Sequence, residues 1–179
     1  MRAPGIGTAA GVVPPLRLPM LLRVGIGNDL HRLADGRKLI LGGVRIPFDK
    51  GPVGHSDGDV LAHAICDALL GAARLGDIGR HFSNTSPQWK NASSLLFLRH
   101  VRRLLDAAGY NIVNIDATVG LERPKLAPHI PPMEKKVAAA LALKLGQVSV
   151  KAKSGEGLDA VGRGEAIRAD AVALIQTCS

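Results

Sequence analysis

Aromatic residues are scarce in this chain of 179 residues: one Trp, one Tyr and three Phe make up 3% of it. Proteins that bind single-stranded nucleic acid usually stack the bases on several aromatic side chains, so the composition disfavours that class. The chain also lacks any run of five basic residues, although its net charge is +8. Scattered basic residues favour an ordinary solvated surface or pockets for phosphate groups over nucleic acid or a membrane surface.

Cysteines and long apolar runs are few as well. The two cysteines, Cys66 and Cys178, give no disulfide framework and fit a reducing compartment, so we expect a cytoplasmic protein. No apolar run reaches the roughly 18 residues of a membrane-spanning helix. The chain instead has 46% hydrophobic and 21% charged residues, which is typical of a globular domain with one buried core.

Residues 1–19 differ from the rest of the chain. They are rich in Gly, Ala and Pro, and Pro14, Pro15 and Pro19 exclude a continuous helix. They also lack the apolar run of roughly 7–15 residues that a signal peptide needs. We expect either a disordered extension or an artefact of start-site choice, because Met20 directly precedes the first strand pattern. Residues 20–179 are then expected to form a single catalytic domain.

From Met20 onward, strand and helix patterns alternate. The expected strands are 21–27, a hairpin of 38–41 and 44–46 around Gly42-Gly43, 111–119 and 147–152; the expected helices are 57–75, 93–108 and 131–144. Residues 77–90 and 154–164 are predicted as loops. Residues 165–175 suit a helix by their alanines, but a closing strand fits the preceding loop better. This order predicts an α+β fold with a mixed four-stranded sheet and helices on one face.

A carboxylate and two imidazoles suggest a metal site. Asp29 and His31 stand two residues apart, so in a strand they point to the same side. His63 lies in the predicted first helix, between Asp59 and Asp67 on one helix face. Two His and one carboxylate leave a fourth position open, which is the pattern of a catalytic zinc site.

The start of this helix offers further candidates. Ser56 is a plausible N-cap, with Asp59 three residues later in a capping-box pattern, and Gly76 is expected to end the helix. His55 precedes the cap, where free N–H groups attract anions; a loop histidine without a role is the alternative. Cys66 is a rival ligand, although a helical cysteine is more often a small core residue.

A third signal is the segment KAKSGEG at 151–157, followed by GRGE at 162–165. Its glycines let a backbone approach a ligand closely, and its Lys and Arg side chains neutralise phosphate. Glu156 could hold a divalent cation that bridges phosphate oxygens. The Walker A order of residues is absent, so the segment indicates phosphate binding of another kind.

Taken together, these segments resemble the 2-C-methyl-D-erythritol 2,4-cyclodiphosphate synthase family. The matching stretches are RVGIGNDLH (23–31), LGGVRIP (41–47), GHSDGDVLAHAICDALLGAARLGDIG (54–79), RPKLAPHI (123–130), KAKSGEGLDAVGRGEAI (151–167) and ADAVALI (169–175). They cover essentially the whole chain except the extension.

The resemblance implies roles for individual residues. Asp29, His31 and His63 match zinc ligands, one zinc ion per subunit, and Glu156 matches the ligand of a second cation, Mg²⁺ or Mn²⁺, on the diphosphate. His55 matches a residue that stabilises the transition state. Ser154 stands where the family has a Thr with the same role, and it keeps the hydroxyl group.

The resemblance also implies a substrate-binding set. It consists of Asp29, His31, His55, Ser56, Asp77, Ile78, Gly79, Phe82, Ser83, Asn84, Thr85, Ser86, Leu121, Lys125, Leu126, Ala127, Lys153, Ser154, Gly155, Glu156, Ala160 and Arg163. Residues 121–127 match the segment around the cytidine, and 77–79 and 82–86 match loops at the methylerythritol part. Ser83–Ser86 lacks two acidic residues common in the family, so its contacts with the sugar are expected to differ. Ala160 replaces a frequent Phe, which would widen a cavity that the family has on a threefold axis.

The implied activity is that of a phosphorus–oxygen lyase in non-mevalonate isoprenoid biosynthesis. The 2-phosphate of 4-diphosphocytidyl-2-C-methyl-D-erythritol 2-phosphate attacks the β-phosphate and releases CMP. The implied assembly is a homotrimer with its sheets around the threefold axis, without nucleic acid or membrane partners. Two alternatives are a metal-dependent phosphohydrolase, which would release inorganic phosphate, and a basic RNA-binding module, whose RNA affinity would depend steeply on salt.

Overall fold

The computed structural model describes residues 20–83 and 85–178, so the expected disorder of residues 1–19 lies outside it. The strands are β1 (Leu22–Asp35), β2 (Leu39–Leu41), β3 (Val44–Ile46), β4 (Lys50–Pro52), β5 (Tyr110–Gly120), β6 (Val148–Lys153) and β7 (Ala166–Thr177). The helices are α1 (Val60–Ala73), α2 (Ile78–His81), α3 (Ser94–Ala107) and α4 (Ile130–Ala140), with short 3-10 turns η1 (Pro87–Trp89), η2 (Ala127–His129) and η3 (Leu145–Gln147). None of the helices described is long and apolar enough to cross a membrane.

The main sheet has five strands in the order β4-β1-β7-β5-β6, and β2 and β3 form a separate hairpin. Only β5 and β6 run parallel, so the sheet is mixed, as predicted. The predicted number of four strands is wrong. The extra strand, β4, is only three residues long and contains Gly51 and Pro52, so it lacks the alternating pattern that marks a strand.

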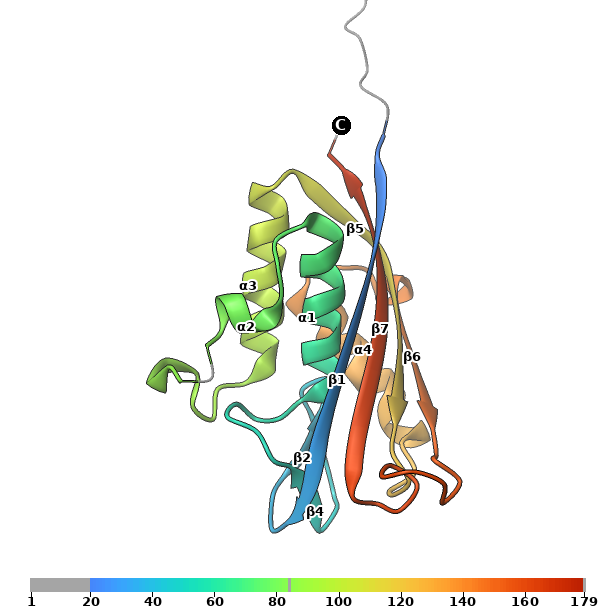
Figure 1. The fold of residues 1–179 in the computed structure, drawn as a ribbon. Coiled ribbons are helices and arrows are strands. Elements are labelled where there is room, and N and C mark those ends of the chain that lie inside the picture. Colours follow the sequence, from blue (N-terminus) through green and yellow to red (C-terminus); the bar gives the residue numbers. More distant parts are fainter. Residues whose placement is uncertain (1–19, 84, 179) are drawn as a thin grey trace, which may run out of the picture.

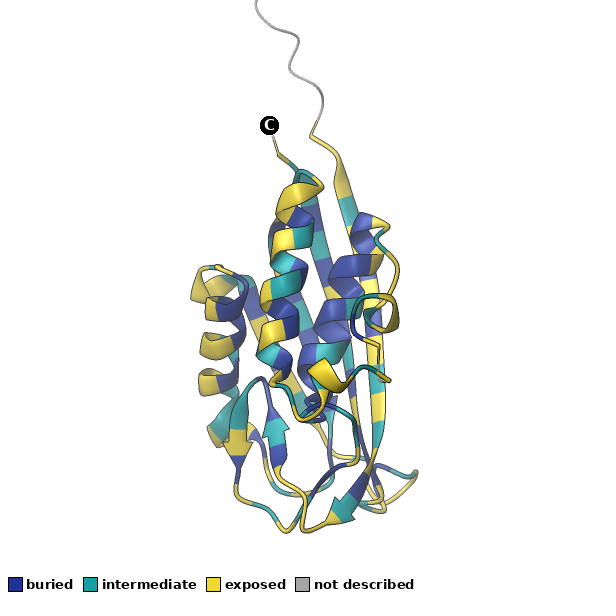
Figure 2. Ribbon diagram, turned by 90° about the vertical axis from the view of Figure 1, so that its left-hand side faces the viewer, coloured by how far each residue is buried: buried dark blue, intermediate teal, exposed yellow. Residues whose placement is uncertain are grey.

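Helices cover one face of this sheet, as the sequence predicted, and the other face is left open (Figure 1). Alternate residues of β1 therefore differ in exposure. Gly25, Gly27 and Leu33 are buried under the helical layer, whereas Val24 and Ile26 are exposed on the open face. Helix α1 lies at the centre of the core, and eleven of its residues are buried (Figure 2).

The first helix begins later than the sequence predicted. Its N-cap is Asp59, whose carboxylate accepts a hydrogen bond from the Ala62 N–H, so the predicted N-cap at Ser56 is wrong. Asp59 also accepts bonds from the N–H groups of Gly42 and Gly43 and ties the hairpin turn to the helix start. The helix ends at Ala73, and its C-cap Arg74 adopts the left-handed conformation, so the predicted end at Gly76 is wrong.

The remaining elements depart from expectation mainly at their ends. β1 continues eight residues past the predicted end at Gly27, because its pairing with β7 extends to Arg32 and its last three residues pair with β4. The predicted loop 77–90 contains α2 and η1, and α4 ends at Ala140 rather than Lys144. Residues 166–177 form the strand β7, which confirms the preferred interpretation of that segment.

Candidate active site

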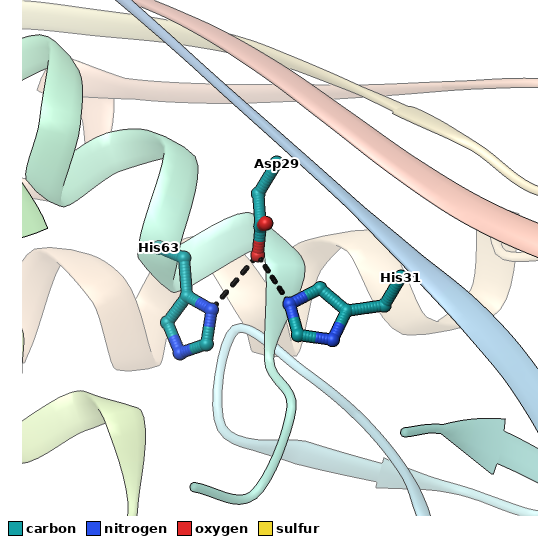
Figure 3. A group of neighbouring side chains, drawn as sticks. All are labelled: Asp29, His31 and His63. Carbon is teal, nitrogen blue, oxygen red and sulfur yellow. Dashed lines mark hydrogen bonds and ion pairs between the residues drawn. The ribbon is translucent and has the colours of Figure 1, made fainter. Parts of the chain in front are cut away.

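Asp29, His31 and His63 form a compact group at the junction of β1 and α1 (Figure 3). The Asp29 Oδ2 atom lies 3.0 Å from His31 Nε2 and 2.8 Å from His63 Nδ1. All three potential ligand atoms lie within 4.8 Å of one another. A tetrahedral zinc ion with bonds of about 2.0–2.1 Å needs ligand atoms about 3.3 Å apart, so small shifts would adapt this group to a metal.

The second nitrogen of each imidazole is held by the protein. His31 Nδ1 lies 2.6 Å from the Val53 carbonyl oxygen, which can accept its proton. His63 Nε2 lies 2.9 Å from Ser94 Oγ and 3.1 Å from Ser56 Oγ. These contacts leave His31 Nε2 and His63 Nδ1 to face Asp29. Metal-binding histidines typically have such an outer partner, so the donor set fits a metal such as Zn²⁺.

The charges in the group are strongly linked. Burial by itself would raise the pKa of Asp29, but hydrogen bonds and charge from His31 and His63 outweigh it and lower this pKa to about 2. The hydrogen bond to Asp29 in turn raises the pKa of His31, against the opposing effect of burial. Asp29 is therefore ionised across the physiological range and supplies the negative charge that a cation needs.

Two carboxylates predicted to share the face of His63 do not join this group. Asp59 is fully buried at the helix start and binds backbone N–H groups there. Asp67 accepts a hydrogen bond from the Ile78 N–H, 2.7 Å away. Cys66 is also fully buried and is not a member of the group. Within residues 20–83 and 85–178, no other set of three such side chains has the same closeness.

The group faces a cavity of about 290 Å³. Its lining residues are Asp29, His31, Gly54, His55, Ser56, His63, Ile78, Gly79, Phe82, Trp89 and Phe97. The cavity thus combines a polar end with an apolar wall, which suits a small ligand that carries both anionic and hydrocarbon parts.

A second, larger cavity of about 740 Å³ lies elsewhere on the chain. It is lined by Phe48, the whole segment 121–127, Ala152, Lys153 and Ser154. The segment 121–127 directly follows β5, and residues 152–154 form and follow the end of β6, which runs parallel to β5. The two cavities share no lining residue, so a single chain keeps its two groups of candidate residues apart.

A family model described as "YgbB family" matches residues 22–176. The chain belongs to this family. Relatives named 2-C-methyl-D-erythritol 2,4-cyclodiphosphate synthase include one from Nitrosospira multiformis, 56% identical over 86% of this chain and 86% of that protein. Another, from Chloroherpeton thalassium, is 55% identical over 87% of this chain and 99% of that protein. A solved structure of a synthase of this name in a CDP-bound form has a TM-score of 0.79 and 39% identity, covering 86% of this chain and 99% of that one.

The YgbB-family chain brings many of the predicted site residues together. The smaller cavity contains Asp29, His31, His55, Ser56, His63, Ile78, Gly79 and Phe82, and the larger one contains Leu121, Lys125, Leu126, Ala127, Lys153 and Ser154. The Nε2–H of His55 can donate to the Ser86 carbonyl oxygen, 2.9 Å away, which links the predicted catalytic residue to the predicted sugar loop.

Other predicted residues line neither cavity. Asp77 caps α2 through a bond from the Arg80 N–H, and the hydroxyl groups of Ser83 and Thr85 bond to each other. Asn84 lies outside the described residues. The roles assigned to these residues stay predictions.

The predicted phosphate loop is exposed on this chain. The Ser154 hydroxyl donates to Glu156, and the Gly155 N–H donates to Glu122 at 3.0 Å. Arg163 pairs with Glu165 on the surface, and Ala160 accepts a backbone bond from the Glu165 N–H. Glu156 has a left-handed backbone, with φ of 49°. Glu156 is not a member of the Asp29 group.

Sequence reasoning named Phe82 as a substrate-binding residue but missed Trp89 and Phe97, which complete the aromatic wall of the smaller cavity. The Phe97 ring stacks on the His63 ring with centroids 6.0 Å apart, and Phe82 stacks on Phe97 at 4.3 Å. Trp89 meets Phe82 edge-on at 5.2 Å. Because aromatic residues make up only 3% of the chain, the presence of Phe82, Trp89 and Phe97 in one segment was a signal that could have been used.

Proposed function

We propose that this chain converts 4-diphosphocytidyl-2-C-methyl-D-erythritol 2-phosphate to 2-C-methyl-D-erythritol 2,4-cyclodiphosphate and releases CMP. The observation that carries the proposal is the group of Asp29, His31 and His63 facing a cavity, in a chain that is more than half identical to proteins named for that product. A cytoplasmic location, without nucleic acid or membrane partners, belongs to the same proposal.

The metals are assigned by donor chemistry. Asp29, His31 and His63 would hold one Zn²⁺ ion, because imidazole nitrogen and carboxylate oxygen are ligands that zinc accepts. Glu156, a carboxylate next to Ser154 and Lys153, would hold a second, oxygen-preferring cation, Mg²⁺ or Mn²⁺. Bound at these positions, divalent cations would supply positive charge that polarises the phosphates.

The two cavities would divide the substrate between them. The larger one has room for a nucleotide, and Lys125 and Lys153 on its lining would offset the charge of the phosphates. The smaller one would take the methylerythritol part, with Ile78 and Phe82 against its carbon atoms. A related synthase solved in a CDP-bound form supports the nucleotide assignment.

The chemistry requires no nucleophile from the protein, since the 2-phosphate of the substrate is the nucleophile. A bond forms between an oxygen of that phosphate and the β-phosphorus, and the bond from the β-phosphorus to the oxygen that leaves with CMP breaks. His55 and Ser154 would stabilise the charge that develops on the phosphoryl oxygens. The remaining contribution of the chain is to hold both phosphates in line for attack.

The assembly we propose is a homotrimer, with the open sheet faces toward the threefold axis. Large apolar side chains project from that face, and Val24 and Ile26 are 68% and 72% exposed. The full set is Leu22, Val24, Ile26, Leu30 and Val172. Such a patch favours burial against other chains. A trimer would also let one chain's Glu156 loop complete the cavity of its neighbour, which supports a site between subunits.

Phosphorus NMR tests the function directly. The purified protein is incubated with the diphosphocytidyl substrate, Zn²⁺ and Mg²⁺, and its products are followed. We expect cyclic diphosphate and CMP in equal amounts. Inorganic phosphate would instead identify the metal-dependent phosphohydrolase. Unchanged substrate, with zinc verified in the protein, would contradict the proposal and direct attention to the unusual Ser83–Ser86 and Ser154 positions.

A further inference from the structure

A buried serine stands between the innermost histidine and a second carboxylate. Ser94, the first residue of α3, is fully buried, and its Oγ lies 2.9 Å from His63 Nε2. On its other side the same hydroxyl donates to Asp57 Oδ1, and the Ser94 N–H donates to Asp57 Oδ2 at 3.0 Å. Asp57, Ser94 and His63 thus form a continuous chain of hydrogen bonds that ends at the imidazole.

The direction of these bonds follows from the groups involved. An ionised carboxylate can only accept hydrogen bonds, and a hydroxyl group has a single proton. The Ser94 proton is used toward Asp57, so Ser94 Oγ can only accept from His63. The Nε2 atom of His63 must therefore carry a proton, and that proton points away from Asp29. Nδ1, the nitrogen 2.8 Å from Asp29, is then the atom that would give its lone pair to a cation in place of its hydrogen bond to Asp29.

We propose that Asp57 and Ser94 are positioning residues for the metal ligand His63: they hold its ring by Nε2 and present Nδ1 to the cation. The inference rests on the proposed metal site and adds to it two residues outside the ligand set. Neither Asp57 nor Ser94 lines the cavity, so neither is placed to touch the substrate. Outer partners of this kind increase the basicity of the ligand and limit its rotation.

Two neighbours share in holding the ring. Ser56 Oγ lies 3.1 Å from the same nitrogen and accepts a bond from the Gly58 N–H, and no carboxylate within residues 20–83 and 85–178 bonds to it. Phe97 stacks on the imidazole face at an interplanar angle of 20°. Because Ser56 can still accept from Nε2 when Ser94 is removed, we expect the loss of Ser94 to weaken metal binding without abolishing it.

Zinc affinity, measured by competition with a chromophoric chelator, tests the proposal without reference to catalysis. We expect Ser94→Ala to bind zinc 10- to 100-fold more weakly than the wild type and Ser94→Thr, which keeps the hydroxyl group, to recover most of the loss. Ser93→Ala is the matched control, because Ser93 is the exposed neighbouring residue and its side chain makes no cap bond. It should bind zinc as the wild type does.

A double-mutant cycle shows whether Asp57 acts on His63 through Ser94, which we call the relay, or whether its substitution only destabilises the protein. If Asp57 acts through Ser94, Asp57→Asn weakens zinc binding in the wild type and has little further effect in the Ser94→Ala background. Equal effects of Asp57→Asn in both backgrounds would overturn the relay. Wild-type affinity in Ser94→Ala would overturn the role of Ser94.

The wild-type protein gives a test that depends on no variant. In the zinc-loaded protein, the ¹⁵N–¹H signal of His63 Nε2–H should be protected from exchange with water, because the proton is bonded to a buried hydroxyl group. Exchange as fast as that of an exposed histidine would contradict the inference. A wild-type chain that binds no zinc at all would instead refute the metal site of the proposed function, so the two failures are distinguishable.

Discussion

Gly27 of β1 lies directly against the carbonyl oxygen of Ala64 in α1. A Cβ atom added at Gly27 would stand 2.1 Å from that oxygen, and one added at Gly25 would stand 1.9 Å from the Ala68 oxygen. Helix α1 therefore approaches β1 more closely than a side chain at Gly25 or Gly27 would allow. Since His63 precedes Ala64 and Asp29 follows Gly27 by two residues, this close approach also sets the distance between the two ligands.

Gly27→Ala should therefore damage both stability and the metal site. Its Cβ would collide with helix backbone, which has no flexible end to move aside, so we expect the free energy of unfolding to fall by about 3 kcal/mol and zinc affinity to fall with it. Chemical denaturation and chelator competition measure the two effects. Gly71→Ala is the control. Gly71 lies in α1, and an added Cβ there would have no atom of the described residues within 4 Å, so the free energy of unfolding should rise by about 1 kcal/mol. Unchanged zinc affinity in Gly27→Ala would contradict the link.

His63→Ala should lose zinc and activity together. Removal of His63 leaves only Asp29 and His31, too few protein ligands for a tight zinc site. Metal content by plasma emission spectrometry and CMP release measure the outcome. His129→Ala, at a histidine that lines neither cavity, should keep both. Full zinc occupancy in His63→Ala would refute the ligand assignment.

Glu156→Gln should weaken the second cation and spare the first. The amide keeps the size of the carboxylate but loses its charge, so the Mn²⁺ concentration for half-maximal activity should rise about tenfold or more. The zinc content should stay at one ion per chain. Asp106→Asn, at an exposed carboxylate near the end of α3, serves as the control. Loss of zinc together with the second cation would mean that the two sites are not separate.

Ile26→Glu should separate the proposed trimer into single chains. Ile26 is 72% exposed at the centre of the open apolar face. Assembly of the variant would bury one introduced carboxylate from each of the three chains there without a partner, which is costly. Light scattering should give the mass of three chains for the wild type and one for the variant, and the variant should lose activity because its site lacks the neighbouring loop. A Lys135→Glu variant, at an exposed position on α4, should remain trimeric. A wild-type protein with the mass of one chain would refute the assembly.

Cys66 and Cys178 should react very differently with a thiol reagent. Burial, together with the charges of Asp67 and Asp59, raises the pKa of the Cys66 thiol well above its usual value, whereas Cys178 is exposed. At pH 8 one thiol per chain should react in the native protein and two after denaturation. Because only the unfolded chain ionises Cys66 near pH 9, the free energy of unfolding should fall as the pH rises above 9. In Cys178→Ala, rapid labelling of the native protein would contradict the burial of Cys66.

Some features of this site could be predicted from local sequence because they depend on local geometry. Asp29 and His31 share one side of a strand by its two-residue repeat, and this prediction is confirmed. The helical face around His63 was predicted by the same kind of rule, but Asp59 does not join the His63 group. Its carboxylate instead accepts hydrogen bonds from the Ala62 N–H at the start of α1 and from the Gly42 and Gly43 N–H groups of the hairpin turn. Helix periodicity gives the direction of a side chain, but it does not reveal which backbone donors compete for it.

What the sequence by itself determined is the alternation of elements, the family, and the three residues able to bind a metal, since each depends on residue type and short spacing. The tertiary structure alone decided that Gly27 meets Ala64 and that Ser94 meets His63. It also placed Phe97 on the same imidazole and left the apolar face of β1 uncovered. These contacts join segments that are distant along the chain, and the packing of α1 and α3 against the sheet brings them together.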